Sequence, residues 1–198
     1  MTSPTAAPGR RPTRSAADTR DRILAAATTE FAERGLAGGR VDRIAAAADA
    51  NKERIYAYFG SKEGLFDEAV RAIIDELLDL VPFDALDLPG YAVRLHDFTL
   101  THPNLVRLGL WYSLERPSPP EDLPQAKAST ARKVEALAAA QRSGAVSDSI
   151  DPHRLIPLLL GMAQGGILLG PTPADAGEVE ARREALRVAV ARLIEPDG

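Results

Sequence analysis

Apolar residues recur at three- and four-residue steps along most of the chain, which is the spacing of one face of an α-helix. Over residues 19–34, Ile23, Ala27 and Phe31 are stacked at four-residue steps, and Gly35 follows where such a helix would end. No segment shows sustained alternation of apolar and polar residues, whereas Ala, Leu, Arg and Glu dominate. The pattern therefore predicts an all-α fold.

Capping residues and prolines divide the pattern into about nine helices. Asn51 and Ser61 are predicted N-caps, and Asp151-Pro152 combines an N-cap with proline at the first helical position. In chain order, the predicted helices cover residues 19–34, 41–47, 51–58, 61–80, 91–101, 104–115, 124–143, 152–169 and 174–194. The proline-rich stretches 116–120 and 170–173 are predicted loops.

Three parts are expected along the chain. Residues 1–16 contain three prolines and several arginines and are predicted to be a disordered basic arm. Residues 17–77, called the head below, should hold three helices with a helix-turn-helix at 40–59 and the start of a longer linking helix. Residues 78–198, the body, should be a second helical unit that binds an effector and dimerises.

The segment NKERIYAYF has the pattern of a helix that reads a DNA groove. If Ile55 points into the core, then at roughly 100° per residue Phe59 joins it, while Glu53 and Ala57 face directly away. Such a helix is short, is anchored by one apolar face, and presents donors and small side chains to a groove about 12 Å wide. An ordinary surface helix is the alternative interpretation.

The exposed side chains of this helix suit contacts with DNA. Lys52 and Arg54 can reach base edges or phosphates, Ala57 permits close approach, and the hydroxyls of Tyr56 and Tyr58 can donate to phosphate oxygens. Glu53 needs a cytosine amino group or Arg54 as its partner, because phosphate repels a carboxylate. Lys62 can bind phosphate together with the free backbone amides at the start of the following helix.

The charge distribution supports this prediction although the net charge of −4 does not. Residues 1–62 hold eleven Lys and Arg against seven Asp and Glu, whereas the remainder holds thirteen against twenty-one. The chain therefore has a basic N-terminal third and an acidic remainder, and phosphate contacts need cations. Arg10, Arg11 and Arg14 in the arm either lie along a minor groove or belong to a solvated tail.

The stretches TRDRILAAATTEFAERG and RVDRIAAAADANKERIYAYFGSKEGLF resemble the TetR family of bacterial transcriptional regulators over approximately residues 17–77. The resemblance implies an all-α homodimer that binds a palindromic operator, with a variable C-terminal domain that takes a small ligand or a partner. The family's DNA-contact positions correspond to Arg40, Lys52, Glu53, Arg54, Tyr56, Tyr58 and Lys62.

Three positions depart from the family pattern. Asp49 stands where the turn usually has Gly, Ala50 stands where a larger aliphatic residue is usual, and Arg40 stands where Ser or Thr often caps the helix. Asp tolerates the left-handed backbone better than most residues, so the turn should survive with about 1 kcal/mol of strain. We expect weakened rather than abolished DNA binding.

Aromatic residues in the two predicted helices at 91–115 are candidate walls of an effector pocket. Tyr91 and His96 belong to this set, and a well-packed core with surface histidines is the alternative. The candidate ligand-binding residues are Phe98, His102, Arg107, Trp111, Tyr112 and Gln164. The effector is expected to be a small molecule of unknown identity.

The last two predicted helices have features of a four-helix dimer interface. Pro157 should bend the first of them, and Gly161 and Gly165 are spaced for close helix approach. Leu186, Val190 and Leu193, with Val179, form an apolar stripe on the second. Packing of the same stripe inside one protomer is the alternative.

Other functional classes receive little support. The chain has no cysteine and only three scattered histidines, so no catalytic constellation, metal site or cofactor is expected. No secretory signal or membrane-spanning run is evident, so a cytoplasmic location is expected. The leading hypothesis is an effector-responsive repressor in which the helix at 61–80 couples body to head. A protein-interaction module and a small helical enzyme are the alternatives.

Overall fold

The computed structural model describes residues 16–118, 122–168 and 175–196, and these hold nine α-helices and no strand. The all-α prediction is confirmed. The predicted arm, residues 1–16, lies outside the described residues except for Ala16, where the first helix begins. The helices are α1 (Ala16–Gly38), α2 (Val41–Ala47), α3 (Lys52–Phe59), α4 (Lys62–Leu80), α5 (Leu88–Thr101), α6 (Pro103–Glu115), α7 (Pro124–Arg142), α8 (Pro152–Leu168) and α9 (Ala176–Leu193).

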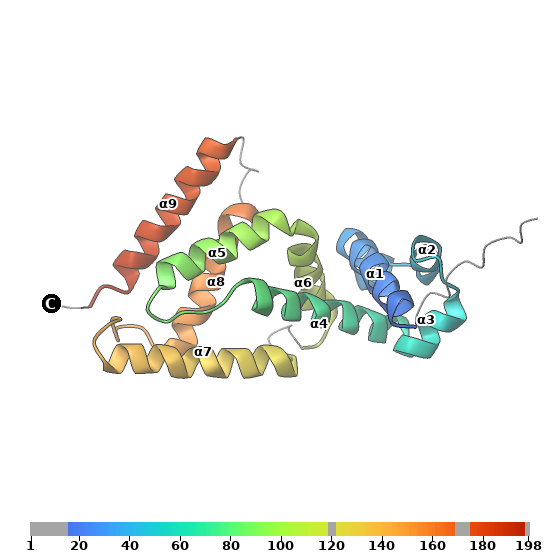
Figure 1. Cartoon of the computed structure of the whole chain (residues 1–198), viewed down its shortest axis with the longest axis horizontal. Helices are drawn as coiled ribbons and strands as arrows, with labels where there is room; N and C mark the ends of the chain where they lie inside the picture. The colour runs from blue at the N-terminus through green and yellow to red at the C-terminus, as the bar shows by residue number, and fades with distance from the viewer. Residues whose placement is uncertain (1–15, 119–121, 169–174, 197–198) are drawn as a thin grey trace, which may run out of the picture.

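The helices form two groups joined by α4 (Figure 1). Helices α1, α2 and α3 lie together at one end, and α4 runs from α3 into the group formed by α5 to α9. Helix α6 packs against α1 more extensively than any other pair of helices packs together. The N-terminal end of α9 projects away from the rest of the chain.

Several helices begin directly after a capping residue that the sequence supplies. Asn51 accepts from the Arg54 amide at 2.9 Å and Ser61 from the Gly64 amide at 2.9 Å, as the capping pattern predicts. Helix α5 begins at Leu88 rather than at the predicted residue 91. The reason is Asp87, whose carboxylate accepts from the Gly90 amide and caps the helix three residues earlier.

The buried apolar residues form two clusters. The head cluster is rich in aromatic rings and contains Ile23, Phe31, Ile44, Ile55, Phe59, Phe66 and Val70, with smaller neighbours. It also contains Leu108 and Tyr112 from α6. The body cluster is mainly aliphatic and includes Leu88, Leu95, Leu137, Leu155, Leu159, Leu186 and Val190. Helix α6 is therefore distant from the head in sequence but supplies part of the head core.

Candidate nucleic-acid interface

Helix α3 is held by two apolar side chains and presents the rest of its surface to solvent. Ile55 is fully buried and Phe59 is 8% exposed, as the helical spacing predicts. Six other side chains of α3 are exposed: Lys52, Glu53, Arg54, Tyr56, Ala57 and Tyr58. Tyr56 is 44% exposed and Tyr58 is 38% exposed.

The turn between α2 and α3 uses Asp49 in the left-handed conformation. Asp49 has φ +49° and is the one non-glycine residue with positive φ in the described ranges. Its carboxylate lies 3.7 Å from Arg22 of α1. Ala50 is half-buried against the head cluster, and its amide donates to the Ala45 carbonyl at 3.0 Å. The turn therefore forms with the backbone conformation that the sequence predicts for Asp49.

The candidate cations differ in how they are held. Arg40 and Arg54 are exposed, and no carboxylate of the described residues lies within 4 Å of either guanidinium. Lys52 is also exposed but forms an ion pair with Asp42 of α2. Lys62 is half-buried, and its ammonium donates to the Gly39 carbonyl at 3.1 Å. Arg40 and Arg54 are therefore the cations most available to an incoming phosphate.

An internal ion pair that the sequence analysis missed positions α2 against α1. Glu30 is 9% exposed and accepts from the Nε of Arg43 at 2.8 Å and from the Arg40 amide at 3.0 Å. The hydrogen bond from Arg43 holds the pKa of Glu30 below its usual range, although burial opposes the shift. Glu30 lies seven residues after Ile23, on the buried face of the helix, and this spacing was the available signal.

Helix α6 packs against the C-terminal part of α1, where Gly35 interrupts the helical backbone. Gly35 has φ +67° inside α1, at the position where the sequence predicts the helix to end. The Glu115 carboxylate accepts from the amides of Leu36 and Ala37, the latter at 3.1 Å. The Trp111 indole donates to the Ala32 carbonyl at 3.2 Å. These contacts define a joint between α1 and α6.

Close packing at this joint leaves no room for a side chain at Gly35. A Cβ there would lie 2.8 Å from Glu115 Oε2 and 2.8 Å from Trp111 Cε3, closer than real Cβ atoms approach. Beside the joint, the Tyr112 ring stacks on Phe66 of α4, with centroids 5.6 Å apart, and Phe66 meets Phe31 of α1 edge-on at 5.0 Å. The joint therefore unites α1, α4 and α6.

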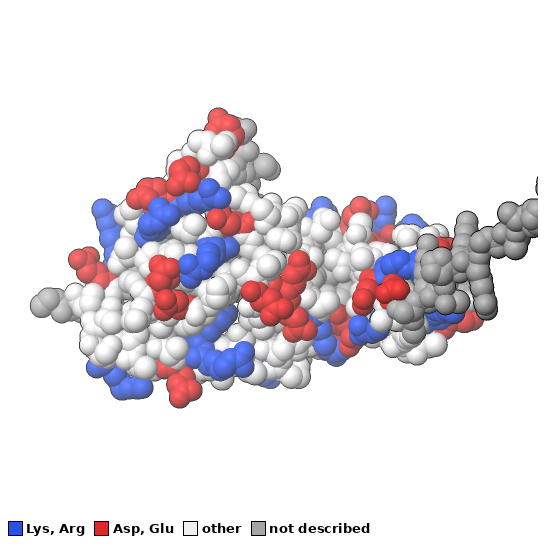
Figure 2. Space-filling model, in the orientation of Figure 1, with Lys and Arg blue, Asp and Glu red and all other residues white. Residues whose placement is uncertain are grey.

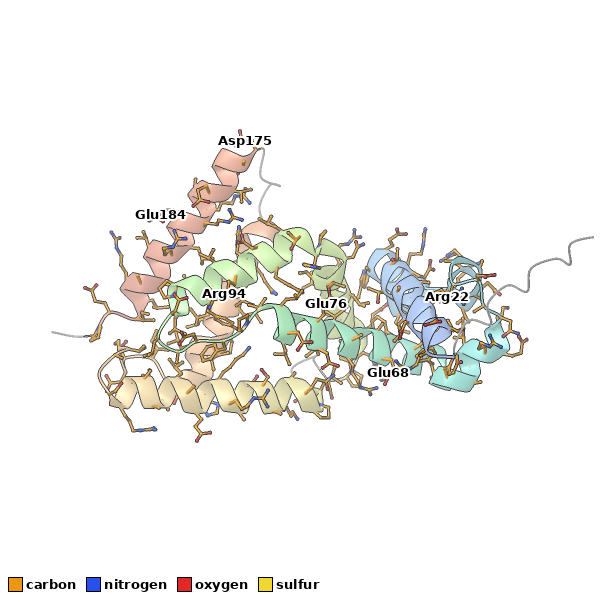
Figure 3. All side chains as sticks on the ribbon, viewed as in Figure 1. Arg22, Glu68, Glu76, Arg94, Asp175 and Glu184 are labelled. Carbon is orange, nitrogen blue, oxygen red and sulfur yellow. The ribbon has the colours of Figure 1, made fainter. Side chains whose placement is uncertain are left out.

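Two ion pairs on α4 extend these contacts. Arg20 of α1 reaches Glu68 at 2.6 Å, and Glu68 is labelled on α4 in Figure 3. Arg116, just after α6, reaches Asp67 at 2.8 Å. Burial raises the pKa of Asp67 although Arg116 opposes the shift. Helix α4 is thus tied to α1 on one side and to the end of α6 on the other.

The structure does not bring the six candidate effector residues into one pocket. Trp111 and Tyr112 lie at the joint, Arg107 is exposed and Gln164 is half-buried. Phe98 and His102 do lie together, with stacked rings and centroids 4.4 Å apart. The Nε2 of His102 is 3.7 Å from Glu76 of α4, which is labelled in Figure 3.

His96, another member of the aromatic region at 91–115, is buried between helices. Its Nδ1 lies 3.0 Å from the Ala163 carbonyl of α8, so that this nitrogen carries the proton and donates to the carbonyl. Its Nε2 has no hydrogen-bond partner among the described residues. His96 therefore contributes to the packing of α5 against α8.

The candidate dimer residues fall into two sets. Leu186 is 8% exposed and Val190 is fully buried, because both pack into the body cluster of their own protomer. This packing corresponds to the intramolecular alternative, and Leu193 is half-buried against the same cluster. Pro157 and Gly161 are exposed on α8, whereas Gly165 is half-buried.

The described ranges hold neither a membrane-length apolar helix nor a cluster of metal-ligating side chains. No helix there is long and apolar enough to cross a membrane. No group of three or more metal-ligating side chains gathers there either. Lys, Arg, Asp and Glu side chains are interspersed over the face shown in Figure 2.

A short, solvent-facing helix that follows a tight turn and a packed supporting helix defines the class of helix-turn-helix DNA-binding regulators. Comparison with known families agrees. Residues 23–69 match the family described as bacterial regulatory proteins of the tetR family, and residues 87–192 match the tetracyclin repressor-like C-terminal domain. The chain therefore belongs to the TetR family.

Individual relatives support this assignment. The chain is 36% identical over 186 residues to HTH-type transcriptional repressor SCO4008 of Streptomyces coelicolor, covering 89% of this chain and 95% of that protein. It is 37% identical to HTH-type transcriptional repressor NicS of Pseudomonas putida over 46% of each chain. The crystal structure of SCO4942 from Streptomyces coelicolor matches with a TM-score of 0.76 and 37% identity, over 89% of this chain and 98% of that one. The protein is a DNA-binding transcriptional regulator and not an enzyme.

Proposed function

We propose that the protein is a repressor that binds a palindromic operator as a homodimer and leaves it when a small effector binds the body. The exposed face of α3 is the observation that carries this proposal. Six of its eight side chains face solvent, among them a cation without a carboxylate partner in the described residues and two phenols. Two relatives of the chain are themselves named transcriptional repressors.

On this proposal each exposed side chain has a distinct role. Arg54 reads a base edge or binds phosphate, and Arg40 binds phosphate beside it. Tyr56 and Tyr58 donate to phosphate oxygens, and Ala57 lets the backbone approach the groove. Lys52 joins them by leaving Asp42, which costs little because both side chains of that pair are exposed.

Lys62 and Glu53 need separate assignments. Lys62 keeps its hydrogen bond to the Gly39 carbonyl and offers its two remaining protons to phosphate. Glu53 is exposed and forms no ion pair with Arg54, so its carboxylate is available to accept from a cytosine amino group. Glu53 would then contribute sequence preference, whereas Lys62 would contribute affinity.

The dimer would form through the outward faces of α8 and α9. Leu158 is 48% exposed beside Pro157 and Gly161, and Val188 on α9 is 39% exposed. These side chains replace Leu186 and Val190 as the apolar contacts with the second protomer. A two-fold dimer places its two α3 helices in successive major grooves about 34 Å apart.

The joint between α1 and α6 would transmit the effector signal. The sequence predicts coupling through α4, whereas Trp111 and Glu115 of α6 also contact α1 directly. A shift of α6 in the body therefore moves α1 and α4 together and changes the spacing of the two α3 helices. To act as a switch, the effector must favour one spacing by a few kcal/mol.

The proposal is tested by selecting bound fragments from a random DNA pool with the full chain and measuring affinity by fluorescence anisotropy. Arg54→Ala should weaken binding about fivefold or more, since a good base contact contributes about 1–3 kcal/mol. Arg142→Ala, which removes an exposed arginine at the end of α7, should leave affinity unchanged. Tyr56→Phe should weaken binding less, and equally for every sequence.

Salt dependence separates this proposal from the interaction-module alternative. A regulator that neutralises several phosphates loses affinity steeply as salt rises. Selection of a two-fold symmetric sequence with such a salt slope supports the proposal. Recovery of no enriched sequence, or equal effects of Arg54→Ala and Arg142→Ala, would overturn it in favour of a module that binds protein.

A further inference from the structure

A cleft of about 320 Å³ opens between the end of α4, the segment at residues 81–87 and α7. One wall is a single face of α7, which carries Ser129, Arg132, Lys133 and Ala136 at helical spacing. Figure 1 shows the segment after α4 passing between α5 and α7. None of the six candidate effector residues predicted from the sequence lines this cleft.

The opposite wall of the cleft is apolar. Leu78 lies in the last turn of α4, whereas Val81 and Phe83 come from the segment that follows the helix. The Phe83 ring meets the buried Tyr91 ring edge-on, with centroids 5.0 Å apart. This wall can bury a short hydrocarbon group, but it offers no acidic side chain.

The ammonium group of Lys133 lies beside the aromatic rings of this wall and forms no ion pair with a carboxylate of the described residues. Its Nζ donates to the Tyr91 hydroxyl at 2.8 Å and lies 5.2 Å and 5.9 Å from the ring centroids of Tyr91 and Phe83. No Asp or Glu of the described residues lies within 4 Å of it. Burial, and then the charge of Arg132, lower the pKa of Lys133.

This arrangement leaves a charge that the protein does not neutralise. A partly buried ammonium is costly unless an anion pairs with it, and aromatic faces and one phenol compensate only in part. Burial raises the pKa of Tyr91 to about 12, so the phenol stays protonated and cannot serve as the anion. Arg132 adds a second positive charge to the same wall, which disfavours a cationic ligand.

We propose that the cleft binds a small organic anion, a carboxylate with a short apolar tail. The carboxylate pairs with the Lys133 ammonium and accepts from the hydroxyl of Ser129, which is 5% exposed. The tail lies against Leu78, Val81 and Phe83. The assignment of this anion as the effector rests on the proposed function, whereas its binding does not.

Binding is tested on the full chain without DNA by calorimetric titration with hexanoate, hexan-1-ol and hexylamine. These probes share one tail and differ in charge. Hexanoate should bind at least tenfold more tightly than the other two. Lys133→Met should reduce hexanoate affinity to that of hexan-1-ol, and Lys133→Arg should restore part of it. Lys127→Met, which makes the same change at an exposed site on α7, should have no effect.

A second readout keeps the test independent of folding damage. Removal of an unneutralised cation should leave the melting temperature of Lys133→Met equal to or above that of the wild type. Equal affinity for the three probes, or undiminished hexanoate binding by a folded Lys133→Met variant, would overturn the proposal. If hexanoate binds through Lys133 but does not release the selected DNA, the binding site is supported and its role as the effector site is overturned. The proposal that the protein binds DNA is not affected by that result.

Discussion

The two apolar clusters differ in the helices that contribute to them and in the surfaces that border them. The head cluster is completed by α6, which supplies Leu108 and Tyr112 to the packing around Phe31 and Phe66. The body cluster is mainly aliphatic and is bordered by the Lys133 cleft and by the exposed face of α8. Helix α6 therefore packs as part of the head, whereas the other helices after α4 build the body cluster.

Truncation of the central ring of the head cluster should have the largest effect. Phe66→Ala removes contacts with both Phe31 and Tyr112 and should lower the free energy of unfolding by about 3–5 kcal/mol. Leu159→Ala, the matched truncation in the body cluster, should cost about 2–5 kcal/mol. Denaturant titration checks both values. Simple additivity in the double variant indicates two independent cores, and a coupling above about 0.5 kcal/mol contradicts that separation.

A side chain at the glycine break should force α1 and α6 apart. Gly35→Ala combines positive φ with a collision against Trp111 and Glu115, and should cost about 2–4 kcal/mol. Gly144→Ala has a similar φ of +76° but nothing within 4 Å of the new Cβ, so it should cost only about 1 kcal/mol. The difference in melting temperature between the two variants measures the destabilisation caused by the collision alone. Equal destabilisation would contradict tight packing at the joint, because it would mean that α1 and α6 can accommodate the new Cβ.

Neutralising the carboxylate at the joint should have a smaller effect. Glu115→Gln replaces charge-assisted hydrogen bonds to the Leu36 and Ala37 amides with neutral ones and should cost about 1–2 kcal/mol. Glu135→Gln, at an exposed position on α7, should be neutral within about 0.5 kcal/mol. The decisive measurement is DNA affinity: Glu115→Gln should alter it although the residue is far from α3 in sequence, and Glu135→Gln should not.

Two carboxylates should give the head and the joint opposite pH dependences. The pKa of Glu30 is lowered, so its stabilisation is present above the ordinary value of 4.5 and is lost as pH falls through the folded-state value. The pKa of Asp67 is raised, so ionisation of Asp67 reduces stability as pH rises above 3.8. Stability measured against pH should lose its acid-side decline in Glu30→Gln. If the stability of Glu30→Gln falls at acid pH as it does in the wild type, titration of Glu30 is not the cause of the decline.

The local features of the head could be predicted from the sequence. The spacing of Ile55 and Phe59 fixes which face of α3 is buried, and Asn51 and Ser61 mark helix starts through contacts three residues away. Asp49 adopts the left-handed conformation at the turn, and the tolerance of Asp for that conformation is a property of the residue itself. Each of these predictions depends on neighbours within one helical turn.

The joint could not be predicted, because its partners are far apart in the chain. Trp111 and Ala32 are separated by 79 residues, so helical periodicity carries no sign of their contact. The aromatic cluster around Trp111 therefore suggested a pocket wall, whereas the indole completes the head. Likewise, Lys133 has the sequence context of a solvated helix face, and only the segment carrying Phe83 reveals an unneutralised ammonium.

Native-state hydrogen exchange tests most directly whether α6 belongs to the head. Amides of α6 and α4 should share one opening free energy, and Phe66→Ala should lower it in both while the α9 amides keep theirs. Leu159→Ala should lower the opening free energy of α9 and spare α6. The contradicting result is that the opening free energy of the α6 amides follows that of α9, so that Leu159→Ala lowers it and Phe66→Ala does not. In that case α6 does not share a core with the head, and it cannot transmit the effector signal through that core.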